Sequence, residues 1–302
     1  MKFFAHGKLL LTSEYAVLGG AEALAMPTKL GQHLEVTPLD KDVIRWKSID
    51  EHGVVWYQNS FEKTSFTPKE SGSEITTRLQ QLFTELAQHN PSIWESANGF
   101  SFTTTLDFNR SWGLGSSSTL VSLLAQWARI NPHLLLQAVF GGSGYDIACA
   151  TAQGPIIYQR NGAANPLSKN VSFDPPFKTQ LYFVHLNQKQ DSQKAVAAFD
   201  RNLLSEEKIN IFNILTASFL KATDLALFQK LIFQHEILVG NILGSMPVQQ
   251  RLFSDYTGAI KSLGAWGGDF ILACGNKQTP TYFAQKGYSI CFSYEEFIYD
   301  VS

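Results

Sequence analysis

A glycine- and serine-rich loop is the part of the sequence best suited to hold an anion. It consists of Gly113, Leu114, Gly115, Ser116, Ser117 and Ser118, and an apolar helical pattern follows it directly. Glycines let backbone N–H groups approach an anion closely, and the start of a helix adds further donors and the positive end of its dipole. Serine hydroxyls can donate to phosphate or ligate Mg²⁺. The loop therefore predicts phosphate binding, with a flexible turn capped by serine as the alternative.

Two well-known phosphate-binding motifs do not describe this loop. No Gly-Lys-Ser/Thr ends it, so it is not a Walker A motif. The third glycine of a dinucleotide-binding fingerprint would fall at Ser118, so that motif is excluded as well. A phosphate-binding role would therefore require another kind of loop.

A second glycine-serine loop leads to a candidate catalytic carboxylate. Gly142, Ser143 and Gly144 precede Asp146, which stands in the first turn of a strongly apolar helical pattern. A carboxylate there is either a general base held in a dry cleft beside bound phosphates or an ordinary acidic residue favoured by the helix dipole.

Two further stretches could line a substrate. Residues 264–269 (Gly-Ala-Trp-Gly-Gly-Asp) run into a short apolar strand pattern, which is typical of a tight helix-to-strand connection or of a backbone wall around a ligand. Near the N-terminus, Lys8 lies within an apolar strand pattern and Glu14 follows it. A buried lysine needs a partner, so Lys8 should face an anion unless it lies in solvent on an edge strand.

The elements that position these loops can be placed from periodicity. Strands are predicted at residues 3–11, 23–36, 43–49, 54–61, 100–108 and 155–159. Helices are predicted at residues 74–88, 119–130, 133–140 and 145–152. Ser73 is the expected N-cap of the first of these helices.

The second half of the chain also mixes strands and helices. A segment rich in Asn, Pro and Ser (residues 161–177) predicts a domain boundary and hence domains at 1–165 and 175–302. Strands are predicted at residues 180–185, 270–274 and 288–292, and helices at 192–201, 206–221, 225–243, 248–263 and 281–286. Because the two types do not alternate strictly, the expected class is α+β.

Composition and charge narrow the class of protein. The chain has 302 residues, 44% hydrophobic and 17% charged, which is enough to bury a substantial core in one large or two ordinary domains. The formal net charge is −2 and no basic block is long enough for a nucleic-acid or membrane arm. We therefore expect a small-molecule substrate, no nucleic acid or membrane partner, and a monomer or homodimer.

The cysteines and the N-terminus indicate a cytoplasmic setting. Cys149, Cys274 and Cys291 are odd in number, far apart and set in apolar runs, which favours reduced core thiols over a disulfide or metal site. No zinc-binding spacing is present, so no structural zinc is expected. His6, Gly7 and Lys8 interrupt any signal-peptide core, and no apolar run reaches membrane-span length.

Taken in order, the four motifs resemble those of the GHMP kinase superfamily, which includes galactokinase, homoserine kinase, mevalonate kinase and phosphomevalonate kinase. Residues 8–17 resemble its N-terminal substrate motif, 113–118 its Gly-Leu-Gly-Ser-Ser phosphate loop, 142–148 its Gly-Ser-Gly-x-Asp segment, and 264–269 its C-terminal glycine motif. The Gly-Tyr-Asp-Ile-Ala spelling at 144–148 resembles a bacterial subgroup, often called GYDIA-type GHMP kinases, that is associated with isoprenoid synthesis.

The resemblance implies a fold and a mechanism. The fold is an N-terminal domain like ribosomal protein S5 and a C-terminal ferredoxin-like domain, with the active site between them. The reaction is ATP-dependent phosphoryl transfer with ATP and Mg²⁺ as cofactors. The 113–118 loop would cradle the phosphates, Ser117 would lie near Mg²⁺, Asp146 would orient or deprotonate the acceptor, and Lys8 would balance charge. The implied substrate-binding residues are Glu14, Tyr15, Lys189, Gly264, Ala265, Gly267 and Gly268.

Two features depart from the motifs that the family's members carry. Mevalonate kinases carry a Mg²⁺-binding Glu on the helix before the catalytic Asp, but residues 134–139 contain no carboxylate. The metal would then be held by phosphates, Ser117 and water. Trp266 replaces a glycine of the C-terminal motif, where its indole either stacks on a ligand or packs between domains.

The acceptor that the resemblance implies is mevalonate or 5-phosphomevalonate. Tyr15 stands where mevalonate kinases typically have His, Asp269 follows the glycine pair as in phosphomevalonate kinases, and residues 134–139 lack the Glu. By this resemblance, all three details favour phosphomevalonate. A phosphate acceptor is already ionised and needs no base, so a base at Asp146 favours an alcohol such as mevalonate. A diphosphomevalonate decarboxylase-like lyase and a non-catalytic protein of GHMP fold that binds a ligand are the alternatives.

Overall fold

The computed structural model describes residues 1–70, 72–161, 165–188, 192–266 and 268–301. The chain forms two compact units, each assembled from separate stretches. Unit 1 contains Met1–Gly7, Leu30–Arg110 and Gly115–Thr151, and unit 2 contains Lys8–Lys29, Ser111–Leu114 and Ala152–Ser302. These interleaved units are not the consecutive stretches 1–165 and 175–302, and that domain assignment stays a prediction. Within the described residues, no helix is long and apolar enough to cross a membrane.

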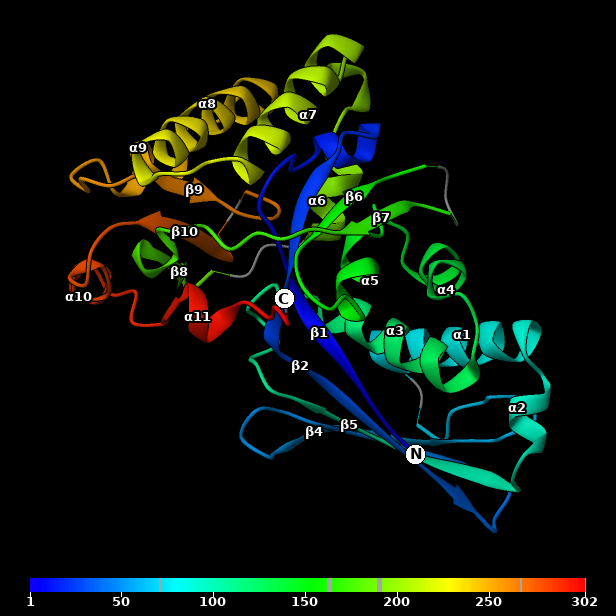
Figure 1. Cartoon of the computed structure of the whole chain (residues 1–302). Coiled ribbons are helices and arrows are strands. Elements are labelled where there is room, and N and C mark those ends of the chain that lie inside the picture. Colours follow the sequence, from blue (N-terminus) through cyan, green and yellow to red (C-terminus); the bar gives the residue numbers. More distant parts are fainter. Residues whose placement is uncertain (71, 162–164, 189–191, 267, 302) are drawn as a thin grey trace. The chain divides into compact units, whose positions relative to one another are not determined.

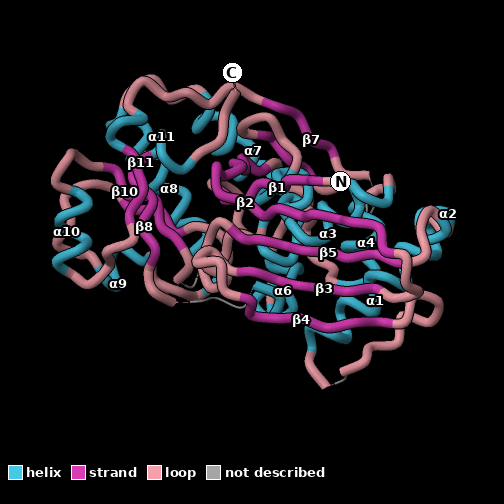
Figure 2. Tube along the Cα trace, turned by 90° about the horizontal axis from the view of Figure 1, so that it is seen from below, coloured by secondary structure: helices cyan, strands magenta, loops and turns pink. Residues whose placement is uncertain are grey.

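Unit 1 is built on a mixed sheet. Its strands lie in the order β4 (Val55–Phe61), β3 (Ile44–Ile49), β5 (Gly99–Leu106) and the last part of β2 (Ala23–Leu39). β3 runs parallel to β5, whereas the other two pairs are antiparallel. β1 (Lys2–Leu10) also pairs with β2. Figure 2 shows these strands side by side. Side chains of β5 alternate between buried and half-buried, as predicted for a strand with one face against the core.

The helices of unit 1 cover one face of this sheet (Figure 1). They are α1 (Glu74–His89), α2 (Ser92–Glu95), α3 (Ser116–Ala128), α4 (Pro132–Val139) and α5 (Tyr145–Ala150). Phe83 on α1 packs at ring distances of 5.2 Å from Phe61 and 5.6 Å from Trp94. Ser73 caps α1 as predicted, because its hydroxyl accepts a hydrogen bond from the Thr76 N–H at 3.1 Å.

Unit 2 contains two sets of strands. The first part of β2 pairs with β6 (Ile156–Gln159), which pairs with β7 (Leu167–Asn170). A separate antiparallel sheet has the order β11 (Cys291–Ser293), β8 (Leu181–His185), β10 (Phe270–Cys274) and β9 (Ile260–Ser262). Every residue of β8, β9 and β10 is buried, so this sheet forms the centre of the unit.

Helices pack around the second sheet. They are α6 (Ser192–Ala198), α7 (Glu206–Leu220), α8 (Leu225–Leu243), α9 (Val248–Leu252), α10 (Thr279–Gln285) and α11 (Tyr294–Phe297). Short 3₁₀ segments lie at η1 (Ala16–Gly19), η2 (Lys178–Gln180) and η3 (Arg201–Leu203). α7 and α8 lie side by side (Figure 1), and α8 contacts β9. Strands and helices are mixed throughout, in agreement with the expected combination of the two types.

One sequence prediction about unit 2 is wrong. The helix predicted at 248–263 ends at Leu252, and β9 follows it. A Cβ on Gly258, just before β9, would lie 1.8 Å from the Cys274 carbonyl oxygen, so the close approach to the end of β10 requires glycine there. The segment 161–177 contains β7, whose exposed residues form an outer strand on β6. Its polar composition suits an outer strand as well as a linker.

The three cysteines are free thiols in the structure. Cys149 and Cys274 are buried, and Cys291 is partly buried. Burial raises the pKa of the Cys291 thiol to about 11, and that of Cys274 also lies above its ordinary value. Both thiols are therefore poor nucleophiles at neutral pH.

Candidate functional site

The glycine-serine loop leads into α3 through two left-handed residues. Gly113 has φ 68° and Gly115 has φ 89°, conformations that favour glycine. The helix begins at Ser116, before the predicted start at Thr119, so all three serines lie in its first turn. Ser118 is buried and donates to the Gly115 carbonyl oxygen at 3.0 Å, whereas Ser117 is exposed. The exposed serine is the one predicted to lie near a metal ion.

The N-terminus of α3 differs from those of the other long helices. α1, α7 and α8 each receive a side-chain cap, from Ser73, Ser205 and Asp224. The N-cap of α3 is Gly115, which provides no side-chain acceptor, and no acidic residue lies in its first turn. No side chain of the N-cap therefore competes for the first-turn N–H groups of α3, which lie at the positive end of the helix dipole.

Lys8 and Asp269 both lie against the first glycine of the loop. The Lys8 ammonium donates to the Gly113 carbonyl oxygen at 2.7 Å, and the Lys8 N–H donates to the Leu114 carbonyl oxygen at 3.1 Å. Lys8 is 9% exposed, so it does not lie in solvent on an edge strand. A Cβ on Gly113 would come within 2.2 Å of an Asp269 carboxyl oxygen. Gly113 is thus required by close approach as well as by its backbone conformation.

Asp146 occupies the first turn of α5, as predicted. The loop before it turns sharply, with φ 109° at Gly142 and 89° at Gly144. Asp146 is half-buried, and one carboxyl oxygen accepts a hydrogen bond from the Ile147 N–H at 3.0 Å. The carboxylate is thereby held in a defined orientation at the start of the helix.

His133 is a neighbour of Asp146 that the sequence analysis did not single out. It lies in the first turn of α4, where the Asn131 side chain accepts from the His133 N–H. Burial lowers the pKa of His133, while the negative charge of Asp146 opposes that shift. The lowered pKa favours a neutral imidazole at neutral pH, so His133 does not neutralise the carboxylate there.

The N-terminal motif and the C-terminal glycine loop meet within unit 2. The Tyr15 hydroxyl donates to the Ala265 carbonyl oxygen at 2.9 Å. Ser13, Tyr15 and Trp266 all have left-handed backbones, with φ of 64°, 62° and 62°. Such conformations cost of order 1–3 kcal/mol each for residues other than glycine and concentrate at functional sites. Tyr15 and Ala265 were predicted substrate-binding residues, and the hydrogen bond joins their two strained loops.

Glu14, between the strained residues Ser13 and Tyr15, is buried in a cluster of ionisable side chains. One Glu14 carboxyl oxygen lies 2.5 Å from the Lys261 ammonium, and the other lies 3.3 Å from His235 Nε2. Lys261 also lies 3.4 Å from a Glu236 oxygen, whose second oxygen accepts from the Ser262 hydroxyl at 2.7 Å. We call Glu14, His235, Glu236 and Lys261 the acidic cluster. All four side chains are almost completely buried.

The acidic cluster holds one positive charge for two carboxyl groups. His235 Nε2 accepts the Ser13 N–H at 2.9 Å, so this nitrogen carries no proton and the ring is neutral. Burial accordingly holds the pKa of His235 well below its ordinary value. Burial raises the pKa of Glu14 to about 7 despite the attraction of Lys261, and burial also raises that of Glu236. Each of the two carboxyl groups therefore keeps a proton to higher pH than an exposed carboxyl group would.

Trp266 packs inside unit 2. It is 9% exposed and belongs to an apolar cluster with Ala16, Phe212, Val239 and Ile242. Its indole nitrogen is buried and has no hydrogen-bond partner among the described residues. Of the two alternatives for this residue, packing against apolar neighbours agrees with the observed contacts.

The structure brings together some predicted site residues and leaves others undescribed. Lys8, Gly113 and Leu114 are in contact, as are Tyr15 and Ala265. Gly264 and Gly268 have left-handed φ values of 62° and 143° in the same loop as Ala265. Lys189 and Gly267 lie outside the described residues. The individual roles assigned to these residues stay predictions.

Sequence reasoning missed the acidic cluster. Lys261 was placed in a predicted helix, where it would face solvent, whereas β9 places it in the core. A weak signal was present, since Lys261 directly follows the apolar Ile260 and Glu236 directly precedes the apolar Ile237. Among the described residues, no group of three or more His, Cys, Asp or Glu side chains is placed to hold a metal ion.

Comparison with known proteins identifies the fold. No family model and no curated protein matches the sequence. Among solved structures, phosphomevalonate kinase of Streptococcus pneumoniae, in complex with phosphomevalonate and AMPPNP, matches with a TM-score of 0.71 at 15% identity, covering 97% of this chain and 99% of that one. Mevalonate kinase of Methanococcus jannaschii matches with a TM-score of 0.69 at 16% identity, covering 97% and 96%.

Galactokinase of Lactococcus lactis, complexed with galactose, also matches, with a TM-score of 0.67 at 13% identity, covering 97% of this chain and 92% of that one. All three of these enzymes are GHMP kinases, so the chain has the GHMP kinase fold that its motifs resemble. Their acceptors differ, so the fold they share does not select among acceptors.

Proposed function

We propose that the chain is a GHMP kinase that transfers a phosphoryl group from ATP to mevalonate or 5-phosphomevalonate. The observation that carries the proposal is the 113–118 loop, whose left-handed glycines lead to a helix N-terminus with no side-chain cap. The chain shares its fold with a phosphomevalonate kinase that binds AMPPNP and with a galactokinase that binds galactose, and this similarity supports the proposal. ATP supplies the phosphoryl group, and the chain supplies binding, orientation and charge.

Phosphate binding would use backbone donors of the loop and of the first turn of α3. These groups fit an anion because they are N–H donors at the positive end of a helix dipole. Ser117, exposed in that turn, is the candidate side chain for Mg²⁺, and its hydroxyl fits a hard cation that keeps several waters. No carboxylate of α4 contributes, since the helix contains none.

Asp146 would orient the acceptor hydroxyl and accept its proton. Its fixed orientation at the start of α5 and its partial burial suit this task. Lys8 would fix the entrance of the loop through Gly113 and add positive charge for the moving phosphoryl group. Glu14, whose carboxyl group is buried against Lys261, would position Tyr15 rather than touch the acceptor itself.

Different features of the chain favour each of the two acceptors. A neutral His133 leaves the negative charge of Asp146 uncompensated by its ring, which disfavours an acceptor that already carries phosphate. Tyr15 and Asp269, in contrast, are the features that resemble phosphomevalonate kinases. We therefore keep both acceptors in the proposal.

A coupled assay of ADP release tests the proposal directly. Purified protein with ATP and Mg²⁺ should turn over with mevalonate or 5-phosphomevalonate and not with homoserine or galactose. Turnover only with a sugar or homoserine would contradict the isoprenoid assignment, and release of CO₂ from diphosphomevalonate would indicate the lyase. ATP binding without turnover on any acceptor would indicate a non-catalytic binding protein.

Two matched pairs of variants separate function from folding. Asp146→Asn should lose most of kcat, whereas Asp42→Asn, which changes an exposed carboxylate in the same unit, should not. Gly113→Ala should abolish turnover because its Cβ would collide with Asp269. Gly53→Ala tests the same left-handed backbone (φ 80°) with no atom within 4 Å of the added Cβ. Normal turnover in Asp146→Asn or Gly113→Ala would remove that residue from the site.

A further inference from the structure

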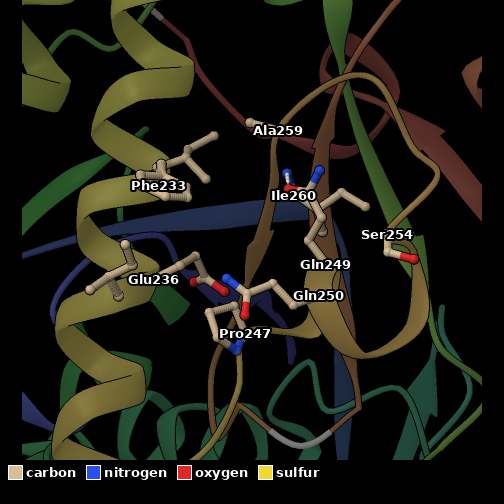
Figure 3. Close-up of a pocket in the computed structure, with 10 residues that line it drawn as sticks. Phe233, Glu236, Pro247, Gln249, Gln250, Ser254, Ala259 and Ile260 are labelled. Carbon is tan, nitrogen blue, oxygen red and sulfur yellow. Dashed lines mark hydrogen bonds between the residues drawn. The ribbon is translucent and has the colours of Figure 1, made fainter.

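A cavity of about 340 Å³ lies within unit 2, between α8, α9 and β9 (Figure 3). Its apolar lining comes from Ile232, Phe233 and Ile237 of α8, from Pro247 and from Ile260 of β9. A cavity of this volume with apolar walls can enclose a small organic molecule. It does not include the glycine loops, and of its lining residues only Glu236 belongs to the acidic cluster.

The mouth of the cavity exposes apolar side chains that a ligand would cover. Phe233 is 60% exposed and Ile237 is 38% exposed, although both lie on the same helix as the buried Ile232. Fully burying such a side chain contributes about 1.5–3 kcal/mol. The apolar rim therefore favours a ligand with a hydrophobic body.

Glu236 is a charged residue that lines the cavity. Of the two carboxyl groups in the acidic cluster, that of Glu236 lies farther from the Lys261 ammonium. In Figure 3 the Glu236 carboxyl group points away from α8 into the space bounded by Gln249 and Gln250. Lys261 is closer to Glu14, at 2.5 Å, than to Glu236, at 3.4 Å. His235 is neutral because its Nε2 accepts a backbone N–H.

The charge balance of the acidic cluster indicates which kind of ligand would suit the cavity. Two carboxyl groups share one ammonium group, so the acidic cluster either holds a proton or keeps a net negative charge. A carboxylate accepts about four hydrogen bonds, and Glu236 accepts from the hydroxyl and the backbone N–H of Ser262 and from the more distant Lys261. A cationic donor that enters from the cavity would satisfy the remaining acceptor sites and neutralise the charge.

We propose that this cavity binds an amphipathic primary ammonium compound. Its ammonium group lies against Glu236, and its apolar body packs between Phe233, Ile237 and Ile260. Binding favours the ionised form of both carboxyl groups, so a cluster that holds a proton releases it as the ligand enters.

Binding at the cavity also reaches the candidate acceptor loops. Lys261 joins Glu236 to Glu14, and Glu14 adjoins Tyr15, whose hydroxyl bonds to Ala265. An ammonium ligand competes with Lys261 for Glu236, and so strengthens the hold of Lys261 on Glu14. The ligand should therefore change the affinity for the acceptor, and the acceptor should change the affinity for the ligand by the same factor. This coupling rests on the proposed function, whereas the binding site does not.

Isothermal titration calorimetry with 2-phenylethylammonium tests the site. The matched probes are 2-phenylethanol, which is neutral, and 3-phenylpropionate, which is anionic. A charge-assisted hydrogen bond corresponds to roughly a tenfold or greater preference for the ammonium over the alcohol. Titrations near pH 7 in buffers of different ionisation enthalpy should show release of up to one proton. Equal affinity for the alcohol, or no binding of the ammonium, overturns the proposal.

Two exposed positions on α8 provide a matched pair of variants. Ile237→Lys places a tethered ammonium at the cavity mouth and should abolish binding of the probe. Leu227→Lys makes the same change at a residue that is 41% exposed and does not line the cavity. This variant should bind 2-phenylethylammonium with normal affinity. Retained binding in Ile237→Lys, or equal loss in both variants, contradicts the assigned position.

The coupling has a separate readout. If the protein turns over an acceptor, saturating 2-phenylethylammonium should change the acceptor KM several-fold in the native chain and leave it unchanged in Ile237→Lys. Binding without any change in KM rejects the coupling. Binding without turnover of any acceptor rejects the proposed function and leaves the ammonium site supported.

Discussion

Removing the Lys261 ammonium should strongly destabilise the protein at neutral and higher pH. Lys261 has no exposed side-chain surface and contacts Glu14 at 2.5 Å, Glu236 at 3.4 Å and the Ser262 carbonyl oxygen at 3.0 Å. Lys261→Met keeps a side chain of similar length but leaves two buried carboxyl groups without a cation. Breaking a buried ion pair by removing one partner costs roughly 3–5 kcal/mol.

The cost should depend on pH in a definite direction. Without Lys261, both carboxyl groups can stay buried only when protonated, so their pKa values in the folded state rise further above the unfolded values. A group with a raised folded pKa contributes stability that is present below its unfolded pKa and lost as pH rises through the folded pKa. The deficit of Lys261→Met relative to the native chain should therefore be larger at about pH 8 than at about pH 5.

Urea unfolding followed by tryptophan fluorescence measures this difference. Lys286→Met is the control, because it removes an ammonium that lies 3.0 Å from Asp255 on the surface and should change the free energy of unfolding far less. A free energy of unfolding for Lys261→Met within about 1 kcal/mol of the native value at pH 8, which is far below the expected cost, would refute the reasoning. A larger deficit at pH 5 than at pH 8 would refute it as well.

Three further outcomes are expected. Burial raises the folded pKa of Glu14 from 4.5 to about 7. The free energy of unfolding of the native chain relative to Glu14→Gln should therefore fall by roughly 3 kcal/mol as pH rises through that range. Urea unfolding measures it, and a rise would contradict the assigned environment. Tyr15→Phe removes the bond to Ala265 and should raise the acceptor KM more than the ATP KM, and equal changes in steady-state kinetics would argue against an acceptor-side role. Ser73→Ala removes the cap of α1 and should cost about 1 kcal/mol by thermal unfolding with turnover unaffected; an unchanged midpoint would mean that water replaces the cap.

The sequence alone predicted the local elements well where one face of each element is buried. β5 alternates along its length and α1 has apolar residues at helical spacing behind a serine cap, so periodicity located both. The predicted helix at 225–243 agrees with α8. The loops at 113–118 and 142–146 were also located, because glycine in left-handed turns before a helix leaves a local signature.

Other features depend on contacts between residues distant in the chain. The helix predicted at 248–263 was wrong because pairing with β10, which no local pattern reports, makes residues 260–262 a strand. That one error concealed Lys261, which as a helical residue would have faced solvent and as a strand residue lies in the core.

The residue types that suit phosphate binding and acid–base chemistry were determined by the sequence, together with the order of their motifs. The tertiary structure decided which of those groups are charged, buried or joined. Glu14 is 247 positions from Lys261 in the chain, yet their side chains form one ion pair in the interior. Burial in a medium of low polarity sets both the strength of that pair and the pKa of Glu14, and burial exists only once the chain has folded.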